Sequence, residues 1–195
     1  EDTPQIAAAA SRVVADMNYQ LTEKMVEFRP EHEKMLWHLA LAGAGFKKVY
    51  FDPTINRQVS MFVPAEDLVI PYGASDARAA ERITHIMRKT KNEVKKLQVA
   101  GFYRDVSLGE PTKYVDEVER RKDEAEGYEG VHDDRYQFLE MQVELDLPGF
   151  EDIDEETDEE TGIALPYVVT LDRGTRNIMS IRRNWDEDDI LKQAK

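Results

Sequence analysis

The residues of this chain that could do acid–base or metal chemistry are its histidines and its many carboxylates. The four histidines are His32, His38, His85 and His132. No two of them have the helical spacing of a zinc protease, and the chain has no cysteine to complete a thiolate zinc site. His38 falls in an apolar helical stretch and His85 follows Thr84, and for both we expect a core or interface role. The histidines therefore predict no catalytic, cofactor-binding or metal-binding residue.

The carboxylates are concentrated in one block, residues 151–160, with the sequence EDIDEETDEE. This block lacks the interleaved glycine and the ligand spacing of an EF-hand loop. We interpret it as a solvated charge run that forms a mobile loop over residues 151–162. Gly43-Ala44-Gly45 follows a helix and is not followed by Gly-Lys-Ser/Thr, so it is not a phosphate loop. The sequence therefore predicts that the chain is not an enzyme. A metal-dependent hydrolase that uses Asp and Glu with His85 or His132 is the alternative from the enzyme class.

The charge balance argues against binding of nucleic acid by bulk electrostatics. The chain has 40 acidic and 26 basic residues, a net charge of −14, whereas phosphate binding needs clustered Lys and Arg. Two basic pairs stand out, Lys47-Lys48 and Arg182-Arg183, and each could contact acids of a neighbouring subunit or a phosphate. No run of eighteen apolar residues and no signal peptide is visible. The absence of cysteine fits a cytosolic protein, and a start at Glu1 without Met suggests a processed chain or a fragment.

The elements that position these residues are organised around Met35–Pro53, where the hydrophobic period changes. Apolar residues recur at helical spacing up to Ala42 and alternate from Phe46 onwards. Two glycines at the change suit a helix C-terminus, where one residue often needs a positive φ. We therefore predict a buried helix that leads directly into a central strand. The residues expected in the core are Trp37, Phe46, Tyr50 and Phe51.

A first amphipathic helix is predicted over Pro4–Phe28, because apolar residues recur there at steps of three and four. Arg29-Pro30 ends it, since the residue before a proline avoids the helical region, and Pro30 opens the second helix. Both helices are expected to pack on the sheet that begins at Phe46. Val59–Val63 returns as an antiparallel partner of the first strand.

Further strands and a capped helix follow. Leu68–Ile70 is predicted as a short strand, and Arg82–Lys89 as a strand in preference to a helix over Ala77–Met87. Thr90-Lys91-Asn92-Glu93 has the pattern of a capping box and predicts a helix over Lys91–Ala100 that Gly101 ends.

The C-terminal half is predicted to be rich in strands after a charged helix over Pro111–Gly127. A long strand covers residues 133–146, and its alternation slips between Phe138 and Met141, which a bulge would explain. Asp172–Thr175 is a turn between two last strands. The predicted fold is α+β, a mainly antiparallel sheet with two N-terminal helices and a further capped helix packed on it. We expect a single body over 1–195, helical over 1–45 and sheet-rich over 46–195.

The order of these segments resembles portal proteins of tailed bacteriophages, particularly those of the podovirus type. A long helix is followed by LALAGAGFKKVYFDP and then by MFVPAEDLVIPYGASDARAAERITHIMRKTKNEVKKL. The resemblance covers about Ala10 to Trp185 and rests on the order and spacing of segments. A family-typical passage falls at Pro64–Asp67, where its role is structural.

The resemblance implies a ring, typically dodecameric, at one vertex of the capsid. Double-stranded DNA passes through such rings without sequence specificity during packaging and ejection, and terminase, capsid and tail or adaptor proteins attach to them. It also implies a location in the virion, and in the host cytoplasm during assembly, with no cofactor and no membrane. The chain would be the wing region, with stem, clip and crown outside it. Ring contacts would use Pro111–Gly127 and the basic pairs, and a generic interaction domain is a further alternative.

Overall fold

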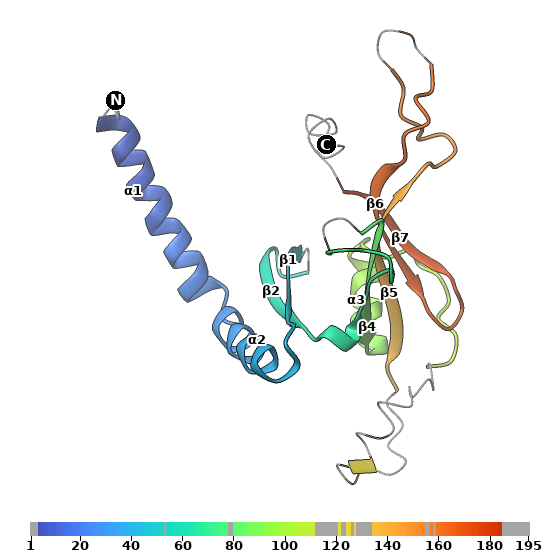
Figure 1. Cartoon of the computed structure of the whole chain (residues 1–195), viewed down its shortest axis with the longest axis horizontal. Coiled ribbons are helices and arrows are strands. Elements are labelled where there is room, and N and C mark those ends of the chain that lie inside the picture. The colour runs from blue at the N-terminus through green and yellow to red at the C-terminus, as the bar shows by residue number, and fades with distance from the viewer. Residues whose placement is uncertain are drawn as a thin grey trace. The chain divides into compact units, whose positions relative to one another are not determined.

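The computed structural model describes residues 4–52, 54–77, 80–111, 121, 124–125, 127, 134–154, 157 and 159–184. In these residues helices precede and accompany antiparallel sheets, so the predicted α+β class is confirmed (Figure 1). The chain divides into two compact units, residues 1–67 and residues 68–195. This boundary differs from the division into helical and sheet-rich regions, 1–45 and 46–195, that the sequence predicts. We call the two parts the first unit and the second unit.

The first unit contains two helices and a hairpin. In chain order these are α1 (Pro4–Tyr19), a π-helical turn (Gln20–Lys24), α2 (Phe28–Ala42), β1 (Phe46–Asp52) and β2 (Arg57–Val63). The predicted hairpin is confirmed, with Phe46 opposite Val63 and Asp52 opposite Arg57. Gly43 ends α2 with a φ of +73°, the left-handed conformation that glycine adopts without a steric penalty.

The break between the two helices lies earlier than the sequence predicts. The chain leaves the helical region at Met25, which is buried, and α2 already begins at Phe28. The Thr22 hydroxyl donates to the Asn18 carbonyl in the turn before the break, a contact that competes with the helical ladder. Pro30 sits inside the first turn of α2, where its missing N–H leaves no bond unmade. The prediction that Arg29-Pro30 separates the helices is therefore wrong.

The core expected around Trp37 is not formed. Trp37 is 79% exposed and Phe51 is 56% exposed, while Phe46 and Tyr50 are half-buried. In the described part of the chain β1 pairs with β2 alone, so it belongs to a two-stranded ribbon and is not a central strand. Such a ribbon is too small to cover two helices. The prediction that both helices pack on the sheet is confirmed for α2, which contacts β2, and is wrong for α1. The prediction of a buried second helix is wrong, because no residue of α2 is buried.

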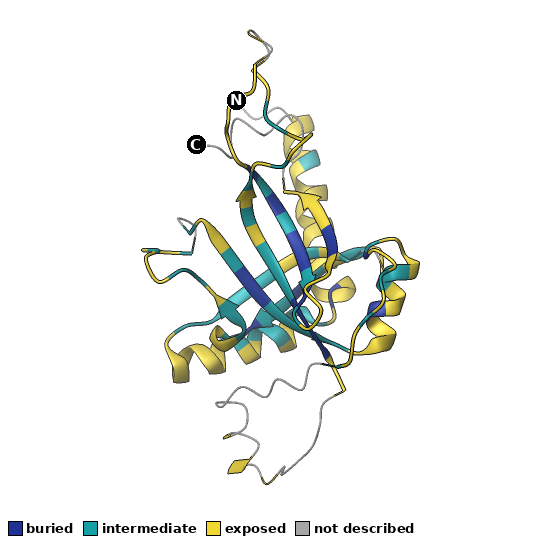
Figure 2. Ribbon diagram, turned by 90° about the vertical axis from the view of Figure 1, so that its right-hand side faces the viewer, coloured by how far each residue is buried: buried dark blue, intermediate teal, exposed yellow. Residues whose placement is uncertain are grey.

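The second unit is built on a five-stranded antiparallel sheet with the strand order β3-β4-β5-β6-β7. The strands are β3 (Leu68–Val69), β4 (Arg82–Lys89), β5 (Tyr136–Leu145), β6 (Leu165–Asp172) and β7 (Ile178–Arg183). The strand prediction for Arg82–Lys89 is confirmed over the helical alternative. Figure 2 shows the buried residues along these strands, while α1 is drawn almost entirely in the exposed colour.

The capped helix is confirmed as α3 (Lys91–Val99). The Glu93 amide donates to the Thr90 hydroxyl at 3.3 Å, and the Thr90 amide donates to the Glu93 carboxylate at 2.7 Å. These two bonds satisfy donors at the helix start that have no partner inside the helix. Val94 then points inward and is fully buried.

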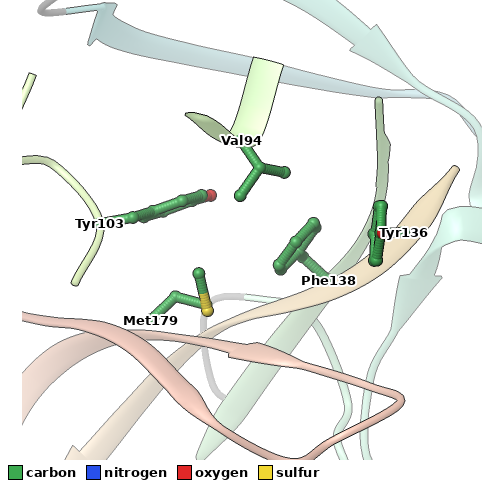
Figure 3. Packing of buried hydrophobic residues seen from close by; sticks show 5 residues of the cluster. All are labelled: Val94, Tyr103, Tyr136, Phe138 and Met179. Carbon is green, nitrogen blue, oxygen red and sulfur yellow. The ribbon is translucent and has the colours of Figure 1, made fainter. Parts of the chain in front are cut away.

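The main core lies between α3 and one face of the sheet. Five side chains point toward a common centre in Figure 3: Val94, Tyr103, Tyr136, Phe138 and Met179. They come from α3, from the segment after it, from β5 and from β7. The opposite face of the sheet carries a second cluster, Leu165, Tyr167 and Val169, against which Met141, Val143 and Leu145 pack.

The two clusters explain the slip in the alternation of β5. Tyr136 and Phe138 face α3, whereas Met141 and Val143 point to the other face of the sheet. The pairing of β5 with β4 and with β6 runs without interruption past this point. The predicted bulge is therefore wrong. The register of β5 stays the same along the strand, and what changes at this point is the face of the sheet on which its apolar residues lie. A register shift occurs instead between β6 and β7, at Thr170 and Leu171.

The two predicted loops of the C-terminal half differ in how much of them is described. The Asp172–Thr175 turn is confirmed: Asp172 is buried, and its carboxylate accepts bonds from the Thr175 hydroxyl at 2.6 Å and from the Thr175 amide at 3.1 Å. In the acidic block, an isolated bridge joins Ile153 and Glu160. Residues 155, 156 and 158 lie outside the described residues, so the mobility of the loop stays a prediction. Most of Pro111–Gly127 also lies outside them.

Candidate assembly surface

The histidines that the structure describes are divided between the two units. His32 and His38 lie on α2 in the first unit, His85 lies on β4 in the second, and His132 lies outside the described residues. The His38 ring contacts the Phe62 ring in a tilted arrangement, with centroids 4.7 Å apart, and His85 is buried opposite Glu140 of β5. No group of three or more His, Asp or Glu in the described ranges is arranged to hold a metal ion.

The two basic pairs are engaged with aromatic rings of their own unit. The Lys47 ammonium lies 3.7 Å from the centre of the Phe28 ring, and the Arg182 guanidinium lies 3.4 Å from that of Phe102. Arg182 also donates to the Phe102 carbonyl, and burial lowers the pKa of its guanidinium. Cations held over ring faces are attracted by the ring quadrupole. This engagement leaves these side chains less available as anchors for an outside partner.

α2 is attached to the hairpin mainly by polar contacts. Arg57 donates to both oxygens of Glu27, at 2.6 and 2.8 Å, in a bidentate ion pair whose side chains are both partly buried. The hydrogen bond from Arg57 holds the pKa of Glu27 below its usual range. One turn later, Glu31 accepts a bond from the Phe62 amide at 2.9 Å. Burial opposes the ionised form of Glu31, but the bonds from Lys34 and from the Phe62 amide still leave its pKa lowered.

Phe28 and Met35 of α2 are half-buried, whereas a further group of its apolar residues lies on the side away from the hairpin contacts. We call Leu36, Trp37, Ala40 and Leu41 the outer face of α2. These positions are one, four and five residues apart, so they lie along one side of the helix. Glu31 and His38, which contact the hairpin, fall on the other side. Trp37 is 79% and Leu41 is 89% exposed.

α1 carries a second apolar stripe. We call Ile6, Ala10, Val13, Met17 and Leu21 the α1 seam. Their steps of three and four residues place them on one face of a helix, and the π-helical turn at Gln20–Lys24 carries the stripe as far as Leu21. The large side chains of the seam are exposed, Val13 by 57%. α1 packs extensively on no other described element of its unit.

The described part of the first unit therefore has few buried apolar residues and a large exposed apolar surface. Its buried apolar residues are Met25 and Val63, whereas the clusters around Phe138 and Tyr167 belong to the second unit. Single exposed apolar side chains are normal, but contiguous exposed stripes mark sites of association. We identify the α1 seam and the outer face of α2 as the candidate functional site, a surface for assembly.

Sequence reasoning found these residues but assigned them to the wrong environment. Amphipathic periodicity shows that one side of a helix will be covered, but it does not identify the element or the subunit that covers it. One signal was available in the turn-rich segments at residues 52–57 and 64–67. One strand fits before the first of these segments and one between the two, and two strands are too few to cover both helices.

None of the described helices has the length and apolarity needed to cross a bilayer. No protein-family model matches the chain, and no characterised protein is significantly similar to it.

Proposed function

We propose that this chain is part of a portal protein of a tailed bacteriophage, a subunit of the ring through which DNA enters and leaves the capsid. The observation that carries the proposal is the exposure of the α1 seam and of the outer face of α2, with Trp37 79% exposed. A unit that leaves its apolar helices uncovered is stabilised by assembly, because burial of this surface on association is favourable. The order and spacing of the chain's segments, from the first helix to α3, support the portal family as the kind of assembly.

The charge of the chain supports the same proposal. A net charge of −14 opposes tight binding to a polyanion. A ring that lets double-stranded DNA slide needs weak contacts that are independent of sequence. In this proposal the partners are further copies of the subunit, terminase, the capsid and tail or adaptor proteins, and the location is the virion.

The test is the assembly state of the full-length protein that contains this chain. Electron microscopy and light scattering are expected to show closed rings, and a fluorescence binding assay is expected to show weak, salt-sensitive DNA affinity without sequence preference. A full-length protein that stays monomeric at high concentration, or that binds one DNA sequence tightly, would overturn the proposal.

The alternative functions give different results in the same experiments. A generic interaction domain would form a finite complex with a different protein and no ring. A metal-dependent hydrolase would melt at a higher temperature with Mg²⁺, Mn²⁺ or Zn²⁺, since a ligand that binds only the folded state stabilises it. Its activity would also be lost on replacement of one Asp or His.

A further inference from the structure

The first unit presents two unlike apolar surfaces on two different helices. The α1 seam is narrow, because alanines occupy residues 7–10, and over the whole of α1 the only charged side chains are Arg12 and Asp16. The outer face of α2 is broad, because Trp37 and Leu41 project from successive turns. The small side chains at residues 7–10 allow close approach at the start of α1, and a face with one large aromatic side chain supplies an anchor. The two surfaces therefore complement each other better than either complements itself.

We propose that the α1 seam of one copy docks on the outer face of α2 of the next copy. The inference rests on the proposed function, in which copies form a ring, and it names the surfaces that meet. A ring requires a head-to-tail contact between two different surfaces, because a contact of one surface with itself closes a pair. With α1 and α2 on the same unit, every copy has one surface of each kind to offer its two neighbours.

The amount of apolar surface fits a second copy of this chain as the occupant. The large side chains that contribute are Ile6, Val13, Met17 and Leu21 on the seam and Leu36, Trp37 and Leu41 on the outer face. A half-exposed large apolar side chain offers roughly 100 Å² and an exposed Trp about twice that, so together they offer on the order of 800 Å². Because about 60% of an interface is apolar, the contact would bury about 1,300 Å² in total. Stable specific interfaces bury about 1,200–2,000 Å².

The contact can be tested by cross-linking, because the chain contains no cysteine. Val13→Cys places a thiol on the α1 seam, and Ala40→Cys places one on the outer face of α2 while leaving Trp37 in place. At high protein concentration a short bismaleimide is expected to join the double variant into a ladder of dimers, trimers and larger species. A mixture of the two single variants is expected to give dimers and nothing larger. Each single variant alone is expected to give no product.

A matched control pairs Val13→Cys with Val99→Cys. Val99 is an exposed apolar residue on α3 and belongs to neither surface. This pair is expected to give no ladder. A ladder of equal yield from the control would show random collision and would overturn the proposal. Dimers from Val13→Cys alone would overturn it too, because they would show that the seam meets itself.

The outcome separates this inference from the proposed function. Rings of the full-length protein in the microscope, together with no ladder from the Val13→Cys, Ala40→Cys double variant, would overturn the docking of α1 on α2 and leave the portal proposal intact. A cross-link between the two thiols of one copy, without a ladder, would also overturn the docking between copies and leave the portal proposal intact. A ladder supports the docking directly, and the absence of both ladder and rings would overturn both proposals.

Discussion

At the scale of single residues, the two aromatic side chains Phe138 and Trp37 have opposite roles. Phe138 is fully buried between α3 and the sheet, whereas Trp37 is 79% exposed. Phe138→Ala is expected to lower the free energy of unfolding by about 3–5 kcal/mol, because it removes buried surface and leaves a cavity. Trp37→Ala is expected to change the stability of the monomer by less than about 0.5 kcal/mol. Urea denaturation followed by circular dichroism measures both.

The matched control for this pair is Phe51→Ala, which removes an exposed aromatic ring from β1. It should behave like Trp37→Ala in the monomer. A loss of several kcal/mol on Trp37→Ala at low protein concentration would show that Trp37 is buried in the monomer. The assembly surface would then need another definition.

The ion pair between Glu27 and Arg57 makes the attachment of α2 to the hairpin dependent on pH. The hydrogen bond from Arg57 lowers the pKa of Glu27 in the folded chain relative to the unfolded chain. The pair therefore stabilises the fold at neutral pH, and this stabilisation is lost as the pH falls through the lowered pKa. Glu27→Gln is expected to speed hydrogen exchange at the hairpin amides at pH 7 and to have little effect under acid conditions.

The control is Glu33→Gln, which removes the partner of Arg29 in an exposed pair along α2. Exposed helical pairs contribute little, so this variant should exchange like the parent chain. Equal effects of Glu27→Gln at neutral and at acid pH would contradict the role assigned to the ion pair.

At the scale of elements, the capping box fixes α3 over the core. Thr90→Ala removes the hydroxyl that accepts the bond from the Glu93 amide. The reciprocal bond, from the Thr90 amide to the Glu93 carboxylate, lowers the pKa of Glu93 and is expected to weaken when the first bond is lost. A loss of about 1 kcal/mol in the free energy of unfolding is expected, as for other N-cap replacements. Thermal and urea denaturation measure it, with Lys91→Ala as the control that keeps the cap. A loss of the same size on Lys91→Ala would argue against capping as the cause.

The fold is expected to remain intact when the acidic block, residues 151–160, is removed. Like charges repel one another, and residues 151–160 offer little apolar surface for packing. Replacement of this block with a short Gly-Ser linker is therefore expected to leave β5 and β6 paired and the melting temperature within a few degrees. A larger fall in the melting temperature would show that the block stabilises the sheet.

At the scale of the whole molecule, the two units differ in their ability to fold alone. The second unit holds both apolar clusters, whereas the buried apolar residues of the first are Met25 and Val63. A unit of about 70 residues with so small a core rarely folds alone. Residues 68–195 are expected to unfold in one cooperative transition, and residues 1–67 to show no cooperative transition as an isolated monomer. Calorimetry and amide dispersion in NMR spectra distinguish the two results.

A cooperative transition from monomeric residues 1–67 would contradict this expectation. It would mean that the ion pair and the aromatic contacts of α2 are enough to hold the first unit. The uncovered helices would then need no partner for stability, and the case for assembly would rest on the exposed apolar surface alone.

The local elements could be predicted from the sequence alone. The hairpin of β1 and β2, the strand β4, the cap of α3 and the turn at Asp172 all follow from patterns within short segments, of which the longest is the hairpin over residues 46–63. Such patterns act through backbone conformation, hydrogen bonds to near neighbours and side-chain alternation, and these are local forces. The α+β class follows from the order of these elements.

The tertiary structure decided which apolar faces are covered. The pattern of α2 is the same whether Trp37 is covered by a sheet or by another subunit, because amphipathicity records only that a face prefers to leave water. β5 shows the same limit, since its slip in alternation reads as a bulge until both faces of the sheet are seen to be apolar. Burial depends on partners far away in the chain or in another chain. The physical reason is that the hydrophobic effect is not directional.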